Sequence, residues 1–373
     1  MSTRDELDIF LVTAPGLEDL LRAEAVEKGF RKPKAEPGGV SVRGGWAEVW
    51  RANLELRGAS RVLVRIAAFR VKHLAQLDKL AREVPWGDVL RPDVPVHVEA
   101  ACKKSRIYHS GAAAERLAKA VQDELGAPVK KDAVVSIKVR ILKDVCTISI
   151  DTSGDALHKR GHKEAVSKAP MRENLAAMFL RQCGYKAREP VFDPMCGSGT
   201  FVIEAAEIAA RLFPGRSRSF AFEQLSTFDE TAWQDLRARQ HPITPDVRFC
   251  GSDVDAGAVR MSDENAARAG VDAFCDFALS PIEEIAPPPG PPGLVMINPP
   301  YGTRIGDVKQ LTGLYKSLGH RLMAHFPGWR VGLVTSVDHL AQVTGLPFAH
   351  ESGPVVHGGL RVKVHSTAGL PQP

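Results

Sequence analysis

The chain has 373 residues, of which 44% are hydrophobic and 25% are charged. This length predicts two or three domains, and the composition is that of a soluble globular protein rather than of a disordered or membrane-spanning one. The six cysteines include no C-x-x-C pair, which argues against a disulfide framework and against a zinc site, so no metal is expected. The acidic start, MSTRDELDIF, lacks the pattern of a signal peptide, and a cytoplasmic location is expected.

The net charge of +5 is unevenly distributed along the chain. Residues 1–165 contain 29 Lys and Arg residues against 23 Asp and Glu residues, whereas the rest of the chain contains 20 against 21. A local basic excess indicates a polyanionic partner, although an ordinary solvated surface would also account for it. Further features of the N-terminal part must decide between these interpretations.

The first 155 residues predict two small α+β domains. An apolar strand at Ile9–Thr13 and the helix after it begin a domain over residues 1–58. A second domain is expected over residues 59–155, followed by a polar linker over residues 156–169. Its expected elements are strands at Val62–Phe69, Val94–Ala100, Val135–Leu142 and Cys146–Asp151, a helix near Ala112–Leu125, and a hairpin turn at Lys143-Asp144.

From residue 170 to residue 373, short apolar strands alternate with helices. The expected strands are 191–193, 248–253, 294–298 and 330–336, and the expected helices are Thr200–Leu212, Gly257–Ala269 and Leu311–Phe326. This alternation predicts a doubly wound, mostly parallel sheet that binds its ligands at the carboxyl ends of the strands. The long connection over residues 213–247 is either a functional lid or a packed helical insertion. The proline-rich run 286–293 is interpreted as a stiff connector.

A glycine-rich loop follows the first of these strands, in the sequence DPMCGSGT. Glycines at such a position permit positive φ angles and a close approach of a ligand to the backbone. The loop lacks the lysine of a P-loop and the third glycine of a dinucleotide fingerprint. It resembles instead the first motif of S-adenosylmethionine-dependent class I methyltransferases. The candidate cofactor residues are Asp193, Pro194, Cys196, Gly197, Ser198, Gly199 and Thr200.

Acidic residues at the end of the second strand and in the stretch FCDFAL downstream of it are further cofactor candidates. Asp253 ends the second strand and can accept hydrogen bonds from both ribose hydroxyls, whereas Asp255 is expected to cap a helix. Asp276 is a candidate acceptor for an adenine amino group, with Phe277 covering the ring, although this stretch also fits a surface turn. Cys196 could suggest a covalent nucleophile, but we interpret it as a packing residue because it lies in the cofactor loop.

The sequence NPPY begins at the last residue of the expected strand 294–298 and resembles the motif of methyltransferases that modify a planar exocyclic nitrogen. The candidate catalytic residues are Asn298, Pro299, Pro300 and Tyr301. The Asn298 side-chain oxygen and the Pro299 carbonyl can accept the two N–H groups of adenine N6, guanine N2 or glutamine N5. Pro300 stiffens the turn, and Tyr301 can stack on a flipped base.

The N-terminal part resembles a THUMP domain, an RNA-binding module, preceded by a ferredoxin-like domain. Basic side chains cluster in KKSRIYHS and in ALHKRGHKE, and the candidate RNA-binding residues are Lys103, Lys104, Arg106, His158, Lys159, Arg160 and Lys163. The phrases TSGDALHKRGH, DPMCGSGTFVIEAA and INPPYGTRI extend the resemblance over nearly the whole chain. The family that they resemble is that of the bacterial 23S rRNA guanine-N2 methyltransferases.

This resemblance implies a Rossmann-like class I methyltransferase domain, S-adenosylmethionine as cofactor, and structured RNA as partner. It implies methylation of guanine N2 in 23S rRNA, and tRNA guanine-N2 methyltransferases with the same architecture remain an alternative. An adenine-N6 DNA methyltransferase or a glutamine-N5 protein methyltransferase would leave the basic N-terminal part unexplained. The rival from another class is a non-catalytic RNA-binding assembly factor. A monomer is favoured, and no partner membrane is expected.

Overall fold

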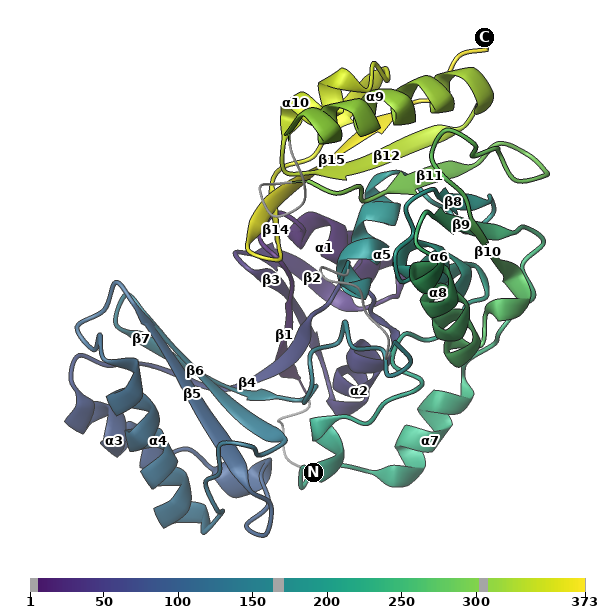
Figure 1. The fold of residues 1–373 in the computed structure, drawn as a ribbon. Coiled ribbons are helices and arrows are strands. Elements are labelled where there is room, and N and C mark those ends of the chain that lie inside the picture. The colour runs from purple at the N-terminus through teal and green to yellow at the C-terminus, as the bar shows by residue number, and fades with distance from the viewer. Residues whose placement is uncertain (1–5, 164–170, 302–307, 373) are drawn as a thin grey trace. The chain divides into compact units, whose positions relative to one another are not determined.

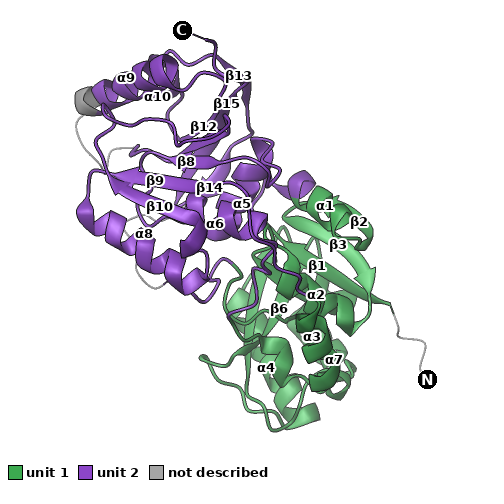
Figure 2. Ribbon diagram, turned by 90° about the vertical axis from the view of Figure 1, so that its right-hand side faces the viewer, with its two compact units in different colours: residues 1–13, 21–157, 218–239 green, residues 14–20, 158–217, 240–373 purple. Residues whose placement is uncertain are grey.

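The computed structural model describes residues 6–163, 171–301 and 308–372. Its contacts divide the chain into two compact units, each assembled from separate segments (Figure 2). Unit 1 consists of residues 1–13, 21–157 and 218–239, and unit 2 consists of residues 14–20, 158–217 and 240–373. Within the described residues, no helix has both the length and the apolar character that crossing a bilayer requires.

Unit 1 is built on a sheet with the strand order β2-β3-β1-β4-β7-β6-β5 (Figure 1). Its strands are β1 (Leu7–Val12), β2 (Arg31–Glu36), β3 (Gly39–Gly44), β4 (Arg61–Arg70), β5 (Val96–Lys103), β6 (Val135–Leu142) and β7 (Val145–Asp151). β4 lies between β1 and β7 and pairs with both. A single sheet therefore runs through the regions expected to form the ferredoxin-like and THUMP domains.

Helices accompany this sheet, and two of them cover the β5–β7 part. The helices of the N-terminal half are α1 (Glu18–Glu27), α2 (Trp46–Glu55), α3 (Leu74–Arg82) and α4 (Ser110–Leu125), with a short 3₁₀ helix at Trp86–Asp88. α3 and α4 pack against each other, and α4 packs on β5 (Figure 1). Lys143 and Asp144 adopt φ values of 51° and 62°, as a two-residue hairpin turn requires, so the predicted turn between β6 and β7 is confirmed.

Residues 218–239 return to unit 1 from the middle of the methyltransferase-like half of the chain. They contain a 3₁₀ helix (Ala221–Gln224) and the helix α7 (Glu230–Ala238). The Phe222 and Phe228 rings lie 6.1 Å and 5.9 Å from the Trp50 ring of α2, and Trp233 packs edge-on against Phe222 at 5.0 Å. Of the two interpretations of this connection, the packed insertion agrees with the structure.

Unit 2 is built on a sheet with the order β10-β9-β8-β11-β12-β15-β13, and β14 pairs with β15. Its strands are β8 (Val191–Asp193), β9 (Phe249–Asp253), β10 (Cys275–Leu279), β11 (Leu294–Ile297), β12 (Arg330–Thr335), β13 (Phe348–Glu351), β14 (Val355–His357) and β15 (Leu360–Thr367). The strands from β10 to β12 are parallel, and β15 is antiparallel to β12. The predicted doubly wound, mostly parallel sheet is confirmed.

Helices cover both faces of this sheet (Figure 1). They are α5 (Glu173–Gln182), α6 (Thr200–Ala209), α8 (Ala256–Ala269), α9 (Val308–His325) and α10 (Asp338–Val343), with a 3₁₀ helix at Asp272–Phe274. Along β11, Leu294 and Met296 join the core formed with α5, α6 and α8, whereas Val295 and Ile297 join the core formed with α9 and α10. Because these strands are buried on both faces, their side chains are mostly apolar, and polar side chains lie at the strand ends.

Candidate active site

The loop between β8 and α6 has the conformation that its glycines predict. Gly197 and Gly199 adopt φ values of 55° and 79°, in the left-handed region. A Cβ atom added at Gly199 would lie only 3.1 Å from the side chains of Ile203 and Ser262, so space as well as φ favours glycine there. The loop ends where α6 begins at Thr200, and the N-terminus of a helix is a suitable position for polar groups of a ligand.

Asp253 holds this loop against the end of β9. One of its carboxylate oxygens accepts a hydrogen bond from the Gly197 N–H at 2.9 Å, and the other accepts one from the Asp255 N–H at 3.0 Å. Asp255 itself accepts a hydrogen bond from Gly257 and caps α8, as the sequence predicts. Asp253 thus orients the glycine loop in addition to presenting a carboxylate at the edge of the sheet.

Two buried helical side chains hold the same loop from α8. The Ser262 hydroxyl donates to the Gly197 carbonyl at 3.0 Å, and the Asn265 amide donates to the Ser198 carbonyl at 3.1 Å. Both side chains are fully buried. The sequence analysis missed them, and the available signal was a pair of polar residues, three positions apart, on the buried face of a predicted helix.

Burial controls the chemistry of Asp193 and Cys196. Asp193 is 2% exposed, and burial raises its pKa to about 8, with a further contribution from the negative charge of Asp253. Burial also raises the pKa of the Cys196 thiol far above neutrality. The Cys196 thiol is therefore protonated at neutral pH, which agrees with a packing role and not with nucleophilic catalysis.

The NPPY segment emerges beside Asp193, because β11 pairs in parallel with β8. The Oδ1 atom of Asn298 is buried and has no hydrogen-bond partner within the described residues. The Pro300 carbonyl accepts a hydrogen bond from the buried Tyr315 hydroxyl at 3.3 Å, which fixes the segment to α9. Burial raises the pKa of Tyr301 to about 12, so its ring is neutral. The segment therefore presents a rigid amide oxygen at the carboxyl edge of the sheet.

The structure separates Asp276 from this edge. Asp276 is the second residue of β10 and lies opposite Cys250, and its two carboxylate oxygens accept hydrogen bonds from Arg248 at 2.8 Å and 2.6 Å. We therefore leave Asp276 out of the proposed cofactor site. Phe277 packs closely over Gly251, where an added Cβ would lie 2.8 Å from its ring.

Two exposed apolar side chains, and not Asp276, lie at the carboxyl ends of β9 and β10. Val254 follows Asp253 directly and is 72% exposed, and Leu279 ends β10 opposite Asp253 and is 61% exposed. Exposed large apolar residues at a ligand-binding edge suit the face of a planar ring. The sequence signal for Val254 was its position directly after the predicted strand 248–253, whereas no strand was predicted around Leu279.

The candidate RNA-binding residues fall into two groups. Lys103, Lys104 and Arg106 are exposed near the end of β5 in unit 1. The second group begins unit 2, where Lys159 is exposed but His158 is only partly so. Burial and the nearby charge of Arg172 lower the pKa of His158 to about 4, so His158 is neutral at physiological pH.

Arg160 and Lys163 form ion pairs with carboxylates inside unit 2. Arg160 is 1% exposed, and its guanidinium lies 3.3 Å from the equally buried Glu204. The Lys163 ammonium donates to the Thr200 hydroxyl at 2.8 Å and pairs with Glu173 at 3.3 Å. These cations neutralise buried carboxylates, so phosphate contacts by Arg160 and Lys163 are not supported. Lys163 instead anchors the start of α6, directly after the glycine loop.

One cluster within the described residues has the composition of a metal site: Asp338, Glu351 and His365. The Lys363 ammonium lies 2.7 Å from a carboxylate oxygen of both Asp338 and Glu351. Because the lysine already bridges the two acids, we assign this cluster a structural role.

Comparison with known families gives the three predicted domain types in the predicted order. Residues 8–63 match the RlmL ferredoxin-like domain, and residues 71–151 match the THUMP domain. Residues 160–360, more than half of the chain, match the RMKL-like methyltransferase domain. The chain belongs to the RMKL-like methyltransferase family. The predicted fold class and the predicted type of family are thereby confirmed.

Individual relatives agree with this assignment. The chain is 35% identical over 376 residues to the ribosomal RNA large subunit methyltransferase K/L of Syntrophotalea carbinolica, and the match covers 95% of this chain and 53% of that protein. The RMKL-like chain thus spans about half the length of the curated relatives that it matches.

Solved structures resemble the chain over its full length. SMU.472, solved in complex with SAH, has a TM-score of 0.90 and 25% identity, and the match covers 100% of both chains. A possible methylase from Clostridium difficile 630 has a TM-score of 0.88 and 30% identity, with 99% of both chains covered. SAH is the product that S-adenosylmethionine leaves after methyl transfer.

Proposed function

We propose that this RMKL-like protein transfers a methyl group from S-adenosylmethionine to the exocyclic N2 of a guanine in large-subunit ribosomal RNA. The name of the curated relatives supports ribosomal RNA as the substrate. The THUMP domain and the basic excess of residues 1–165 support RNA rather than DNA or protein. The resemblance of INPPYGTRI to guanine-N2 methyltransferases supports the choice of nitrogen.

The observation that carries the proposal is the buried, unpartnered Oδ1 atom of Asn298. A buried acceptor without a donor costs free energy, and a bound ligand or a water molecule can supply the donor. An exocyclic amino group has two N–H groups to donate. The Oδ1 of Asn298 and the carbonyl of Pro299, the next residue, are the acceptors proposed for them.

The residues at the edge of the sheet fit S-adenosylmethionine. The glycine loop gives backbone access, and the carboxylate of Asp253 lies at the end of β9 for the ribose hydroxyls. Asp193 offers a buried carboxyl for the cationic amino group, and Val254 and Leu279 offer apolar surface for the adenine. The cofactor supplies an electrophilic methyl group on a sulfonium, which needs positioning more than acid or base chemistry.

The residues of the chain act on the accepting nitrogen. The lone pair of an exocyclic amine is delocalised into the ring, which makes the nitrogen a weak nucleophile. Two acceptors held in place by Pro300 and Tyr315 favour a more tetrahedral nitrogen whose lone pair points toward the methyl group. The nitrogen gains the methyl group as the carbon–sulfur bond breaks, and it then loses one proton to solvent.

The direct test incubates the full chain with isotopically labelled S-adenosylmethionine and either deproteinised ribosomal RNA or tRNA, followed by mass spectrometry of the nucleosides. Labelled N2-methylguanosine from large-subunit RNA is the expected product. Label in N6-methyladenosine would refute the guanine assignment, and label only in tRNA would refute the substrate. Cofactor binding in calorimetry without any transfer would favour the non-catalytic assembly factor.

A further inference from the structure

One face of the β5–β7 part of the unit 1 sheet is left open by its helices. Side chains alternate along each strand, and Val98, Ile137 and Ile148 are buried on the face that α3 and α4 cover. The residues between them face the opposite way. Their register places Glu99 beside Lys138 and Ala101 beside Arg140. We call this opposite side the open face.

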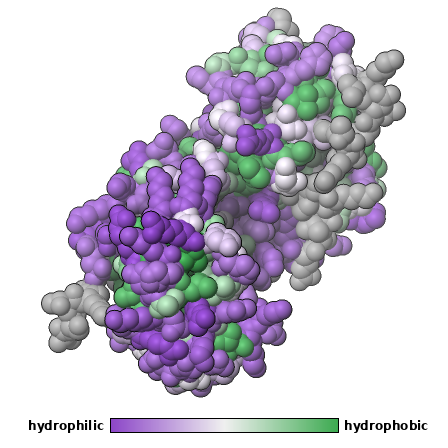
Figure 3. All heavy atoms as spheres, turned by 90° about the vertical axis from the view of Figure 1, so that its left-hand side faces the viewer, coloured by the Kyte–Doolittle hydropathy of each residue, from purple (hydrophilic) through white to green (hydrophobic). Residues whose placement is uncertain are grey.

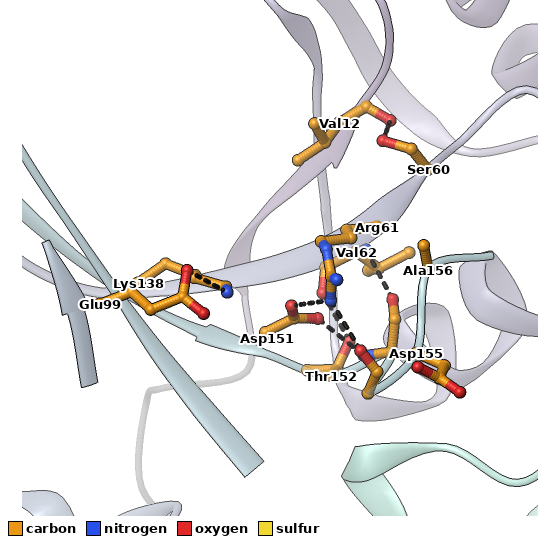
Figure 4. Close-up of polar contacts among 12 residues, drawn as sticks. Val12, Ser60, Arg61, Val62, Glu99, Lys138, Asp151, Thr152, Asp155 and Ala156 are labelled. Atoms are coloured by element: carbon orange, nitrogen blue, oxygen red, sulfur yellow. Dashed lines mark hydrogen bonds and ion pairs between the residues drawn. The ribbon is translucent and has the colours of Figure 1, made fainter. Parts of the chain in front are cut away.

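Charges are neutralised at one end of the open face. Lys138 pairs with Glu99 at 2.8 Å, and Arg61 on β4 pairs with the buried Asp151 on β7 at 2.5 Å (Figure 4). These pairs leave no excess charge for a ligand.

The other end of the open face carries cations without acidic partners. Arg70, Lys103 and Arg140 are exposed, and no ion pair or side-chain hydrogen bond forms for any of them within the described residues. The register places Arg70 opposite Val145 and Lys103 opposite Leu142, in one row across four strands. Adjacent strands are about 4.8 Å apart, so this row spans about 14 Å, with Arg140 one row behind it.

The loop between β5 and α4 adds an exposed aromatic ring to this end. Tyr108 is 84% exposed, the highest exposure among the large hydrophobic side chains of the described residues. The loop is fixed to the β6–β7 hairpin, since Asp144 accepts a hydrogen bond from the Arg106 N–H at 2.7 Å and donates its own N–H to Ser105 at 3.1 Å. Lys143 at the tip of this hairpin is also exposed.

We propose that the open-face patch, formed by Arg70, Lys103, Arg140, Lys143 and Tyr108, is the surface through which unit 1 binds RNA. The cations bind phosphates, and Tyr108 stacks on an unpaired base. The exposed side chains between the cations, Ala68 and Ala101, are small enough for a nucleic-acid backbone to approach the sheet. In the space-filling view of the side that faces left in Figure 1, hydrophilic side chains predominate over the lower part of the molecule (Figure 3).

This inference rests on the proposed function, because it takes RNA as the partner. It assigns Arg70, Arg140, Lys143 and Tyr108, none of which is among the candidate RNA-binding residues selected from the sequence. Salt dependence separates phosphate contacts from other effects, since each contact that releases a counterion contributes nearly one unit to the slope of log K against log salt.

The test measures binding of the full chain to a labelled RNA hairpin with a single-stranded loop, by fluorescence anisotropy over a series of KCl concentrations. We expect the double variant Arg70→Gln, Arg140→Gln to bind more weakly and to lose about 1.5 to 2 units of salt slope. The matched control is Arg91→Gln, Lys119→Gln, which removes the same charge from cations paired with Asp93 and Asp123 in the same unit. The control should keep the slope of the unmodified chain.

Tyr108 is tested separately because base stacking releases no counterions and therefore does not contribute to the slope of log K against log salt. Tyr108→Ala should weaken binding about tenfold without changing the slope, and Tyr108→Phe should bind like the unmodified chain. Thermal unfolding of each variant verifies the fold, which these exposed positions should leave intact.

Three results would overturn the inference: an unchanged slope in the double variant, an equal loss in the matched control, or equal competition by a DNA duplex of the same sequence. Methylation of ribosomal RNA by the unmodified chain is measured in parallel. This measurement distinguishes failure of the proposed RNA-binding patch from failure of the proposed function. Transfer with an unaffected double variant would refute the patch alone, whereas absence of both binding and transfer would refute the function as well.

Discussion

Asn298 and Asp193 lie at the carboxyl ends of neighbouring strands, and burial affects the two side chains differently. Burial leaves the Asn298 Oδ1 atom without a donor, and it raises the pKa of Asp193 to about 8. Both residues could be selected from the sequence because each lies at the carboxyl end of a short apolar strand. The role of Asp276 could not be predicted in this way. Its hydrogen-bond partner, Arg248, lies 28 positions earlier in the chain, and no local pattern indicates that the two residues pair.

Asn298→Ala should lower the turnover of methyl transfer by about 100-fold or more while leaving the affinity for S-adenosylmethionine nearly unchanged. The reason is that the amide oxygen acts on the amino group and not on the cofactor. Single-turnover kinetics and calorimetry measure the two quantities. Asn298→Asp is the control, because it retains acceptor oxygens and should retain more activity than alanine. Near-normal turnover in the alanine variant would contradict the acceptor role.

Asp193 should make the stability of the cofactor-free chain fall as the pH rises. A buried acid whose folded pKa is raised contributes stability that is fully present below the unfolded pKa, near 4, and is lost as the pH approaches about 8. Relative to Asp193→Asn, the free energy of unfolding should therefore decrease between pH 5 and pH 8, by at most about 1.4 kcal/mol per pH unit. Urea denaturation across this range tests it, and a difference independent of pH would contradict it.

At the scale of elements, the sequence predicted those features that depend on neighbouring residues alone, such as strand bounds and turns. The strand Val191–Asp193 has the expected bounds, and the turn at Lys143-Asp144 has the expected φ angles. Long-range partners were not predictable. The interpretation of Arg160 as an RNA ligand failed because its partner, Glu204, lies 44 positions away, and no local pattern indicates that such a cation is buried.

Arg160→Met should lower the free energy of unfolding by about 3–5 kcal/mol, because it leaves Glu204 buried without its cation. Denaturant unfolding measures the change. Lys159→Met, at the exposed neighbouring position, should cost about 0.5 kcal/mol or less. Adding Glu204→Gln to Arg160→Met should restore part of the loss, and a double variant less stable than the single one would contradict the pairing.

At the scale of the whole molecule, the two units do not follow the order of the chain. Residues 14–20 belong to unit 2, and Leu17 lies in its core. Residues 218–239 belong to unit 1, where Phe222 and Trp233 are buried. The aromatic residues of this segment were visible in the sequence, but which unit they pack in depends on contacts with Trp50, far earlier in the chain.

The division between units predicts how fragments behave. A fragment of residues 158–373 should still bind S-adenosylmethionine, because the candidate cofactor residues lie within it, and it should bind RNA poorly. It should also expose Phe222 and Phe228, whose partner Trp50 lies in residues 21–157, and therefore bind a hydrophobic dye and self-associate. Co-expression with residues 1–157 should suppress both effects in dye binding and gel filtration. A monomeric fragment that binds no dye would contradict the assignment of the insertion.

The return of residues 218–239 to unit 1 also has a consequence for synthesis on the ribosome. Unit 1 lacks part of its aromatic core until residue 239 has emerged, which at about 5–20 residues per second is several seconds after residue 157. During that interval the surface around Trp50 is uncovered on a nascent chain. Unit 1 is therefore completed only after the glycine loop between β8 and α6 has been translated, so a chain truncated before residue 218 contains neither a complete unit 1 nor a complete unit 2.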